Sequence, residues 1–177
     1  RLFRSALAIR EEIHGPEHAT VADTLHDLAA LLQFQGRLEE SADLANRALQ
    51  LRERILGQDH ADTARSYLFR AWSSWGRGQV RRAVTVAEQA VEILRHRLGS
   101  QHPDLATAIQ SQSRLCLHLR SIADADRLAQ EVLDIRKSAL GEKHHRVAGA
   151  LENLALVRIF QGRLDEAQTF ARQGLDI

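Results

Sequence analysis

The chain has 177 residues, of which 44% are hydrophobic and 27% are charged, and this balance excludes a disordered polypeptide. Its 24 Lys and Arg residues nearly match its 23 Asp and Glu residues, so nothing in the overall charge points to nucleic acid or to an anionic membrane as a partner. No apolar run approaches the ~18 residues of a membrane span, there is no signal peptide, and the single Cys116 allows no internal disulfide, so we expect a cytoplasmic protein.

The chain contains no methionine, and its last residue, Ile177, falls inside a helical pattern. We therefore expect it to be part of a longer protein. Arginine strongly outnumbers lysine, which occurs only at Lys137 and Lys143. This usage is associated with GC-rich bacterial genes and suggests a bacterial origin.

Apolar residues at helical spacing predict an all-α chain of nine helices and no strand. The first predicted helix covers residues 1–14, and pairs of helices, A then B, follow at 17–35/37–56, 59–77/79–98, 101–119/121–140 and 143–161/163–177. Glycine follows most of these helices, and Gly15-Pro16 ends the first, because glycine tolerates the left-handed closing conformation and proline cannot continue the turn.

A glycine followed three residues later by a histidine recurs every 42 residues, with no insertion or deletion. The four pairs are Gly15/His18, Gly57/His60, Gly99/His102 and Gly141/His144. A fixed period of this length is typical of a repeat array. We divide residues 1–177 into a single array: helix B of a preceding repeat (1–14), full repeats at 15–56, 57–98 and 99–140, and a shorter fourth repeat at 141–177.

Several short patterns recur within the units. They are Ala48-Leu49-x-Leu51-Arg52, Leu56-Gly57-x-x-His60, Leu28-Ala29-x-Leu31-Leu32 and Gln35-Gly36-Arg37-Leu38-x-Glu40. With these residues the chain resembles the tetratricopeptide repeat (TPR), in the 42-residue form found in kinesin light chains and many bacterial proteins. The resemblance implies a right-handed superhelical solenoid of antiparallel helix pairs. It also implies that the A helices line a concave groove that takes an extended peptide or a partner's helix.

The four repeated histidines each precede a helix A, where an imidazole could cap or pack the tight turn. Metal ligands must converge within about 2 Å of one ion, whereas equivalent residues of stacked repeats are separated by a whole helix pair. We therefore expect no metal site, and no motif indicates a cofactor.

The helix A of the second repeat concentrates aromatic residues, including both tryptophans of the chain. Under the family geometry, Leu68, Phe69, Trp72 and Trp75 turn towards the groove, while Tyr67 and Ala71 face the helix's own partner, helix B. Arg70 and Ser74 stand where buried leucines are expected. Two interpretations stay open: the tryptophans form a binding hot spot, or they fill space between neighbouring A helices.

A groove position that often holds a peptide-binding asparagine in the family reads Asp27, Phe69, Ser111 and Asn153 here, so only Asn153 matches. Only Arg65 and Arg114 are candidates for a basic clamp, and a carboxylate-clamp adaptor is not expected. These residues could also be ordinary solvated helix faces. The candidate peptide-binding residues are Arg65, Leu68, Phe69, Trp72, Trp75, Arg114 and Asn153.

The sequence has no phosphate-binding loop, no nucleophile elbow and no zinc-protease motif, and Cys116 lies among leucines like a buried apolar residue, so we expect no enzyme.

The leading hypothesis is a scaffold that binds a peptide or partner segment in the groove, as a module of a larger regulatory or signalling protein. The alternative is a structural spacer or an end-to-end self-association segment. Binding of RNA is disfavoured because such repeats usually run ~35 residues with a basic groove. We expect neither nucleic-acid nor membrane partners.

Overall fold

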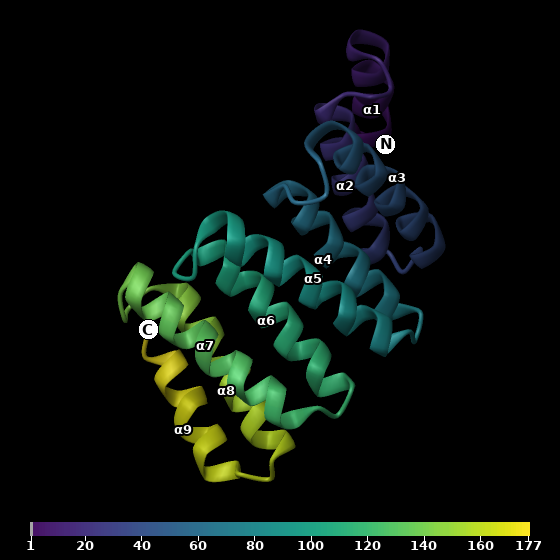
Figure 1. Ribbon diagram of the computed structural model, residues 1–177. Helices are drawn as coiled ribbons and strands as arrows, with labels where there is room; N and C mark the ends of the chain where they lie inside the picture. Colours follow the sequence, from purple (N-terminus) through teal and green to yellow (C-terminus); the bar gives the residue numbers. More distant parts are fainter. Residues whose placement is uncertain (1) are drawn as a thin grey trace. The chain divides into compact units, whose positions relative to one another are not determined.

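The computed structural model describes residues 2–177, and this part of the chain contains nine helices and no strand (Figure 1). The helices are α1 (Leu2–His14), α2 (Ala19–Phe34), α3 (Leu38–Leu56), α4 (Ala61–Gly76), α5 (Val80–Leu98), α6 (Pro103–His118), α7 (Ile122–Leu140), α8 (His145–Phe160) and α9 (Leu164–Leu175). The predicted all-α class and helix count are confirmed, and the predicted ends differ from these by at most two residues. The predicted start at Arg1 lies outside the described residues.

The helices form sequential antiparallel pairs, with α2, α4, α6 and α8 as A helices and α3, α5, α7 and α9 as their B partners. Helix α2 packs on α3, α6 on α7 and α8 on α9, while α3 also packs on α4 and α7 on α8. Helices α3 and α7 therefore each contact both their own helix A and the next one. The contacts divide the chain into two compact units, one ending at Ile93 and the other beginning at Leu94. A single array over residues 1–177 stays a prediction.

Small residues allow the helices of a pair to approach closely. In the first unit Ala22 and Ala48 are fully buried, and larger side chains fill the space around them. This cluster consists of Val21, Ala22, Leu25, Ala48 and Leu51, with Leu7 and Leu44 packed against it.

A buried serine hydroxyl joins helix A to helix B in two of the pairs. The serine lies on helix B in one pair and on helix A in the other. In the first unit Ser41 of α3 donates to the carbonyl of Ala29 on α2, at 2.7 Å. In the second unit Ser113 of α6 donates to the carbonyl of Ala125 on α7, at 2.8 Å. Each hydroxyl is satisfied in the low-dielectric interior, where an unpaired one would be costly.

Each of the four repeated histidines occupies the N-cap of a helix A. Its imidazole Nδ1 accepts a hydrogen bond from the backbone N–H two residues further on: His18 from Thr20 (3.3 Å), His60 from Asp62 (3.2 Å), His102 from Asp104 (3.1 Å) and His144 from Arg146 (3.1 Å). These bonds satisfy donors that the first helical turn leaves without a partner. The predicted capping role is confirmed, and it requires Nδ1 to be unprotonated.

Acid should weaken the cap that His144 provides. Loss of solvation lowers the pKa of His144 from its usual 6.5, and the positive charges of His145, Arg146 and Arg136 lower it further. A lowered pKa means that the folded state favours the neutral ring. The stabilisation is therefore present above about pH 6.5 and is lost as the pH falls through the lowered pKa.

We predict that the melting temperature falls between pH 7.5 and pH 5 and that His144→Asn reduces this fall. Asparagine is also a good N-cap, so the variant should match the wild type at pH 7.5. Thermal unfolding followed by circular dichroism at a series of pH values measures both effects. Part of the fall should remain, because burial also lowers the pKa of His26. An unchanged pH dependence in the variant would contradict the role of His144.

Candidate functional site

Helix α4 has a buried face and a partly exposed face. Tyr67 and Ala71 are buried, at 2% and 0% exposure, while their predicted position against α5, the partner of this helix, stays a prediction. Leu68, Phe69 and Trp72 are partly exposed, and the exposed fraction of Trp75 is 36%. The apolar stripe therefore continues from the core around the helix to the surface.

The inner face of α4 is unusually polar for a repeat core. The hydroxyl of Tyr67 reaches α3, where it donates to Glu53 Oε1 at 2.6 Å; burial, and then this bond, raise the pKa of Tyr67 to about 12. The guanidinium of Arg70 lies 4.8 Å from the centre of the Tyr67 ring, and burial lowers the pKa of Arg70. Ser74 is fully buried, and its hydroxyl has no hydrogen-bond partner among the described residues. Arg70 and Ser74 thus replace leucine-type packing with polar atoms.

The outer face of α4 carries two aromatic contacts. The Phe69 ring meets the His26 ring of α2 edge to face, with centroids 5.0 Å apart. The Trp72 and Trp75 rings meet at 5.6 Å, nearly perpendicular to one another. Such pairs hold large apolar groups in fixed positions at the surface. Arg65, on the same helix, pairs with Asp62 at 2.7 Å.

The two candidate residues of the second unit lie together. The Nε of Arg114 on α6 is 3.4 Å from the amide oxygen of Asn153 on α8. The amide nitrogen of Asn153 donates to Ser113 at 3.1 Å, and Asn153 is fully buried. Arg114 is exposed. The asparagine is thus already bonded within the protein, and the arginine is the part that a partner could reach.

The structure therefore divides the predicted residues into two sets. Arg65, Leu68, Phe69, Trp72 and Trp75 belong to the first unit, and Arg114 and Asn153 to the second. Sequence reasoning named Asp27 at the groove position of α2 but missed its neighbour His26, whose ring contacts Phe69 and on which the charge of Asp27 acts. The repeat period offered a signal, because His26 and Asp27 stand 42 residues before Leu68 and Phe69.

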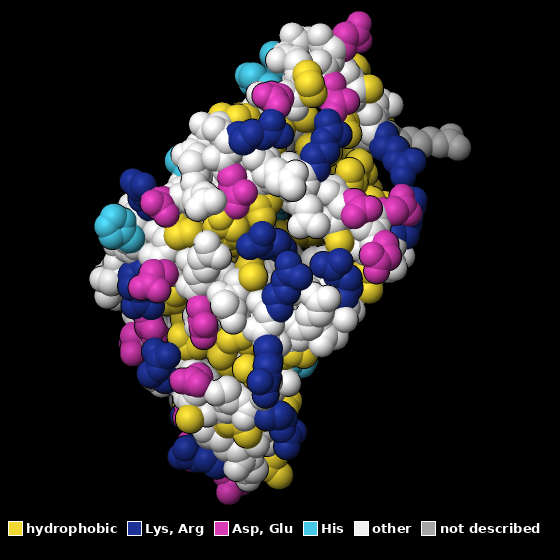
Figure 2. Space-filling view, turned by 45° about the vertical axis from the view of Figure 1, so that its right-hand side comes forward, with side chains coloured by type: hydrophobic (Ala, Val, Ile, Leu, Met, Phe, Trp, Pro, Cys, Tyr) yellow, Lys and Arg dark blue, Asp and Glu magenta, His cyan; other side chains and the backbone are white. Residues whose placement is uncertain are grey.

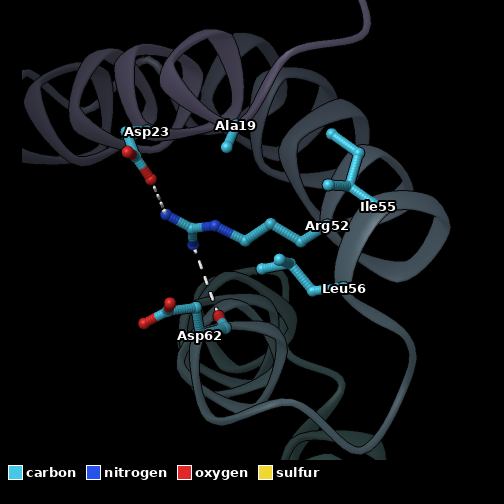
Figure 3. A pocket seen from close by; sticks show the side chains of 6 residues that line it. All are labelled: Ala19, Asp23, Arg52, Ile55, Leu56 and Asp62. Atoms are coloured by element: carbon cyan, nitrogen blue, oxygen red, sulfur yellow. Dashed lines mark hydrogen bonds and ion pairs between the residues drawn. The ribbon is translucent and has the colours of Figure 1, made fainter.

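A small cavity of about 110 Å³ lies among α2, α3 and α4 of the first unit, and Figure 3 shows its lining. Arg52 crosses it: its guanidinium donates to Asp23 at 2.7 Å and to the carbonyl of Asp62 at 3.5 Å (Figure 3). It also donates to the buried hydroxyl of Ser66 at 2.6 Å. The cavity is well below the ~300 Å³ of a small-molecule pocket. Because the cation is already bonded, the cavity is a structural junction and not a ligand site.

The same junction recurs in other repeats. Arg10 donates to the carbonyl of Thr20 at 2.9 Å, and Arg136 to that of Arg146 at 2.9 Å, in each case ten residues ahead, as for Arg52. In α5 the equivalent residue is Leu94, which has no donor. An arginine near the end of helix B thus ties it to the first turn of the next helix A.

The surface seen in Figure 2 carries Lys and Arg side chains as well as Asp and Glu side chains, with apolar atoms between them. None of the helices described for residues 2–177 is long and apolar enough to cross a membrane. Within the same range, His, Cys, Asp and Glu side chains form no group of three or more that could hold a metal ion.

Comparison with known sequences places this geometry in a family. The sequence profile of the tetratricopeptide repeat matches residues 1–54, 21–96 and 113–177. The chain therefore belongs to the tetratricopeptide repeat family. The profile identifies a repeat scaffold and no catalytic domain. No curated protein matches the sequence.

Solved structures with similar folds include a kinesin light chain-like protein of Podosopora anserina with nearly identical TPR-like repeats. It shares 24% identity with this chain at a TM-score of 0.77, covering 99% of this chain and 83% of that one. BtubC (BKLC) from P. vanneervenii has 18% identity and a TM-score of 0.82, covering 99% and 70%. The apo form of RapI has 19% identity and a TM-score of 0.77, covering 97% and 60%. The predicted resemblance to kinesin light chain-like repeats is confirmed for the fold, while the bacterial origin stays a prediction.

Arg52→Leu should lower the free energy of unfolding by about 1–3 kcal/mol, because the buried hydroxyl of Ser66 loses its charged donor. The double variant Arg52→Leu/Ser66→Ala should recover part of this loss, since it reproduces the combination that the chain carries at Leu94 and Ala108. A double-mutant cycle by urea denaturation measures the coupling. Additive losses would show that the hydrogen bond contributes nothing.

Asn153→Ala should lower the free energy of unfolding by about 1–3 kcal/mol, because it removes a buried amide and its bond to Ser113. Arg114→Ala, at the exposed end of the same network, should change it by no more than about 0.5 kcal/mol. Urea denaturation of both variants tests this division of roles. Equal losses would mean that Arg114 is part of the core.

Proposed function

We propose that this chain is a protein-interaction module that binds a peptide or partner segment on the exposed face of its A helices. It would act within a larger regulatory or signalling protein. Tetratricopeptide repeats indicate protein–protein interaction in general. The observation that carries the specific proposal is the aromatic face of α4, where Phe69, Trp72 and Trp75 stay partly exposed.

Large aromatic side chains at a surface favour binding for two reasons. They offer apolar area whose burial is worth about 25 cal/mol per Å², and they lose little conformational freedom when a partner covers them. The edge contacts of Phe69 with His26 and of Trp72 with Trp75 already restrict these rings. The proposed face is therefore partly preorganised, which lowers the entropic cost of association.

In the second unit the proposed contact is Arg114. Its guanidinium is exposed, and the Asn153 oxygen holds its Nε. The remaining N–H groups of an arginine form a fork suited to carboxylates and carbonyls. We assign the partner contact to Arg114 and give Asn153 the role of holding it.

The second candidate function, self-association, is supported by apolar side chains at both terminal helices. In α9 the exposed fraction of Leu175 is 86%, whereas its counterpart in α3, Leu49, is 2% exposed. In α1 the exposed fractions of Leu2 and Ile13 are 87% and 67%. Exposed apolar faces of this kind favour packing against another helix pair, which would be either a further repeat of the same protein or a second copy of it. Sedimentation velocity separates the two candidates, since a monomer over a wide concentration range would count against self-association.

We predict that Trp72→Ala and Phe69→Ala each weaken binding of a peptide, selected from a random linear library, by about tenfold or more. The loss follows from removing buried aromatic contacts at the centre of the proposed face. Isothermal titration calorimetry gives the affinity, and far-ultraviolet circular dichroism checks that each variant keeps its helices. Changes in the chemical shifts of the protein on addition of the peptide locate the binding surface. Changes confined to the B helices would refute the proposal.

A further inference from the structure

The proposed face of the first unit has an acidic side as well as an aromatic one. Helix α2 contains Asp23 and Asp27 and no Lys or Arg, and both aspartates are exposed. One oxygen of Asp23 pairs with Arg52 at 2.7 Å. Asp27 forms no ion pair with any residue in the described range. An unneutralised carboxylate therefore stands at the surface of α2.

The nearby side chains do not neutralise Asp27. His26 lies within electrostatic reach of Asp27, but burial, together with the charge of Arg52, lowers the pKa of His26 and keeps its ring neutral near pH 7. The guanidinium of Arg65 on α4 is engaged with Asp62 at 2.7 Å. Arg52 and Arg65 are thus each paired with a carboxylate other than Asp27.

The carboxylate and the aromatic rings lie on adjacent helices. His26 is the neighbour of Asp27 on α2, and its ring contacts Phe69 of α4 with centroids 5.0 Å apart. This ring contact brings side chains of α2 and α4 together at the position next to Asp27. A lysine or arginine side chain is long enough to lay its aliphatic part on a ring while its charged end reaches a carboxylate on the neighbouring helix.

We propose that the partner segment carries a lysine or arginine next to a bulky apolar residue, with the cation at Asp27 and the apolar residue on Phe69 and Trp72. This inference rests on the proposed function and specifies the chemistry of its partner. An acidic segment is disfavoured here, because its carboxylates would meet Asp27 and Asp23 without a free cation on α2.

The probe for the test is a random linear peptide library displayed on phage and selected on the full chain. Selected peptides are synthesised, together with versions in which each Lys or Arg is replaced by Gln or Glu. Binding is followed by tryptophan fluorescence, because the only two tryptophans, Trp72 and Trp75, both lie on this face. The variants are Asp27→Asn and Asp27→Lys, and Asp43→Asn, an exposed aspartate on α3, is the matched control.

The proposal expects enrichment of a Lys or Arg beside an aromatic or aliphatic residue. Asp27→Asn should weaken binding about fivefold, Asp27→Lys should favour the Glu versions, and Asp43→Asn should change nothing. The difference in affinity between the Lys and Glu versions of a peptide should decrease as the salt concentration is raised.

Two failures can be told apart. One outcome is that selected peptides change the tryptophan fluorescence but contain no basic residue, or that Asp27→Asn does not change their affinity. This outcome would overturn the present inference without contradicting the proposed function. If no selected peptide changes the fluorescence, the proposed function fails and this inference fails with it.

Discussion

The turn from each helix B into the next helix A is the constraint on which the repeat depends. A helix start leaves backbone N–H groups without partners inside the helix, so the turn has to supply acceptors for them. In all four repeats the histidine Nδ1 accepts one of these hydrogens. Glycines at 15, 57, 99 and 141 adopt φ values of +81° to +87°, which close the preceding helix and start the next within a few residues. The fixed length of this junction keeps the 42-residue period free of insertions.

A second interaction fixes the direction in which the next helix leaves the turn. Arg10, Arg52 and Arg136 each donate to a carbonyl in the first turn of the following helix A. An arginine suits this position because its several donors can serve a carbonyl and a second group at once. For Arg52 the second groups are Asp23 and Ser66, and for Arg136 one is Gln110. The partners vary between repeats, but the carbonyl ten residues ahead does not.

Much of the fold was predictable because its causes are local. Helical spacing of apolar residues, glycine after a helix and histidine before one are all visible in the sequence, and they located the nine helices to within two residues. Arg120 shows the limit of this approach. It stands in the column of Gly36, Gly78 and Gly162 and still adopts a φ of 66°, a left-handed conformation that costs a non-glycine residue about 1 kcal/mol or more. The surrounding packing outweighs that cost.

The candidate site was predictable only in part, because it depends on what neighbouring helices leave uncovered. Family geometry turns Trp75 towards the groove, which stays a prediction, and it could not show that Asn153 is buried beneath Arg114. The buried Asn153 donates to Ser113, which is 40 residues away in the chain, and Ser113 donates to a carbonyl of α7 that is 12 residues away. No single-repeat pattern contains such a path.

The polar residues on the inner face of α4 explain why its aromatic residues lie outward. Tyr67, Arg70 and Ser74 occupy the inner face of α4. Large side chains on this helix can therefore lie only on its other faces. Tyr67 satisfies its hydroxyl on Glu53, and Arg70 stacks on the Tyr67 ring, so these groups are stable where they are. The large apolar area of Phe69, Trp72 and Trp75 is then left for the opposite side. Burial of that area remains available to a partner, and the lone carboxylate of Asp27 on α2 favours a partner of positive charge.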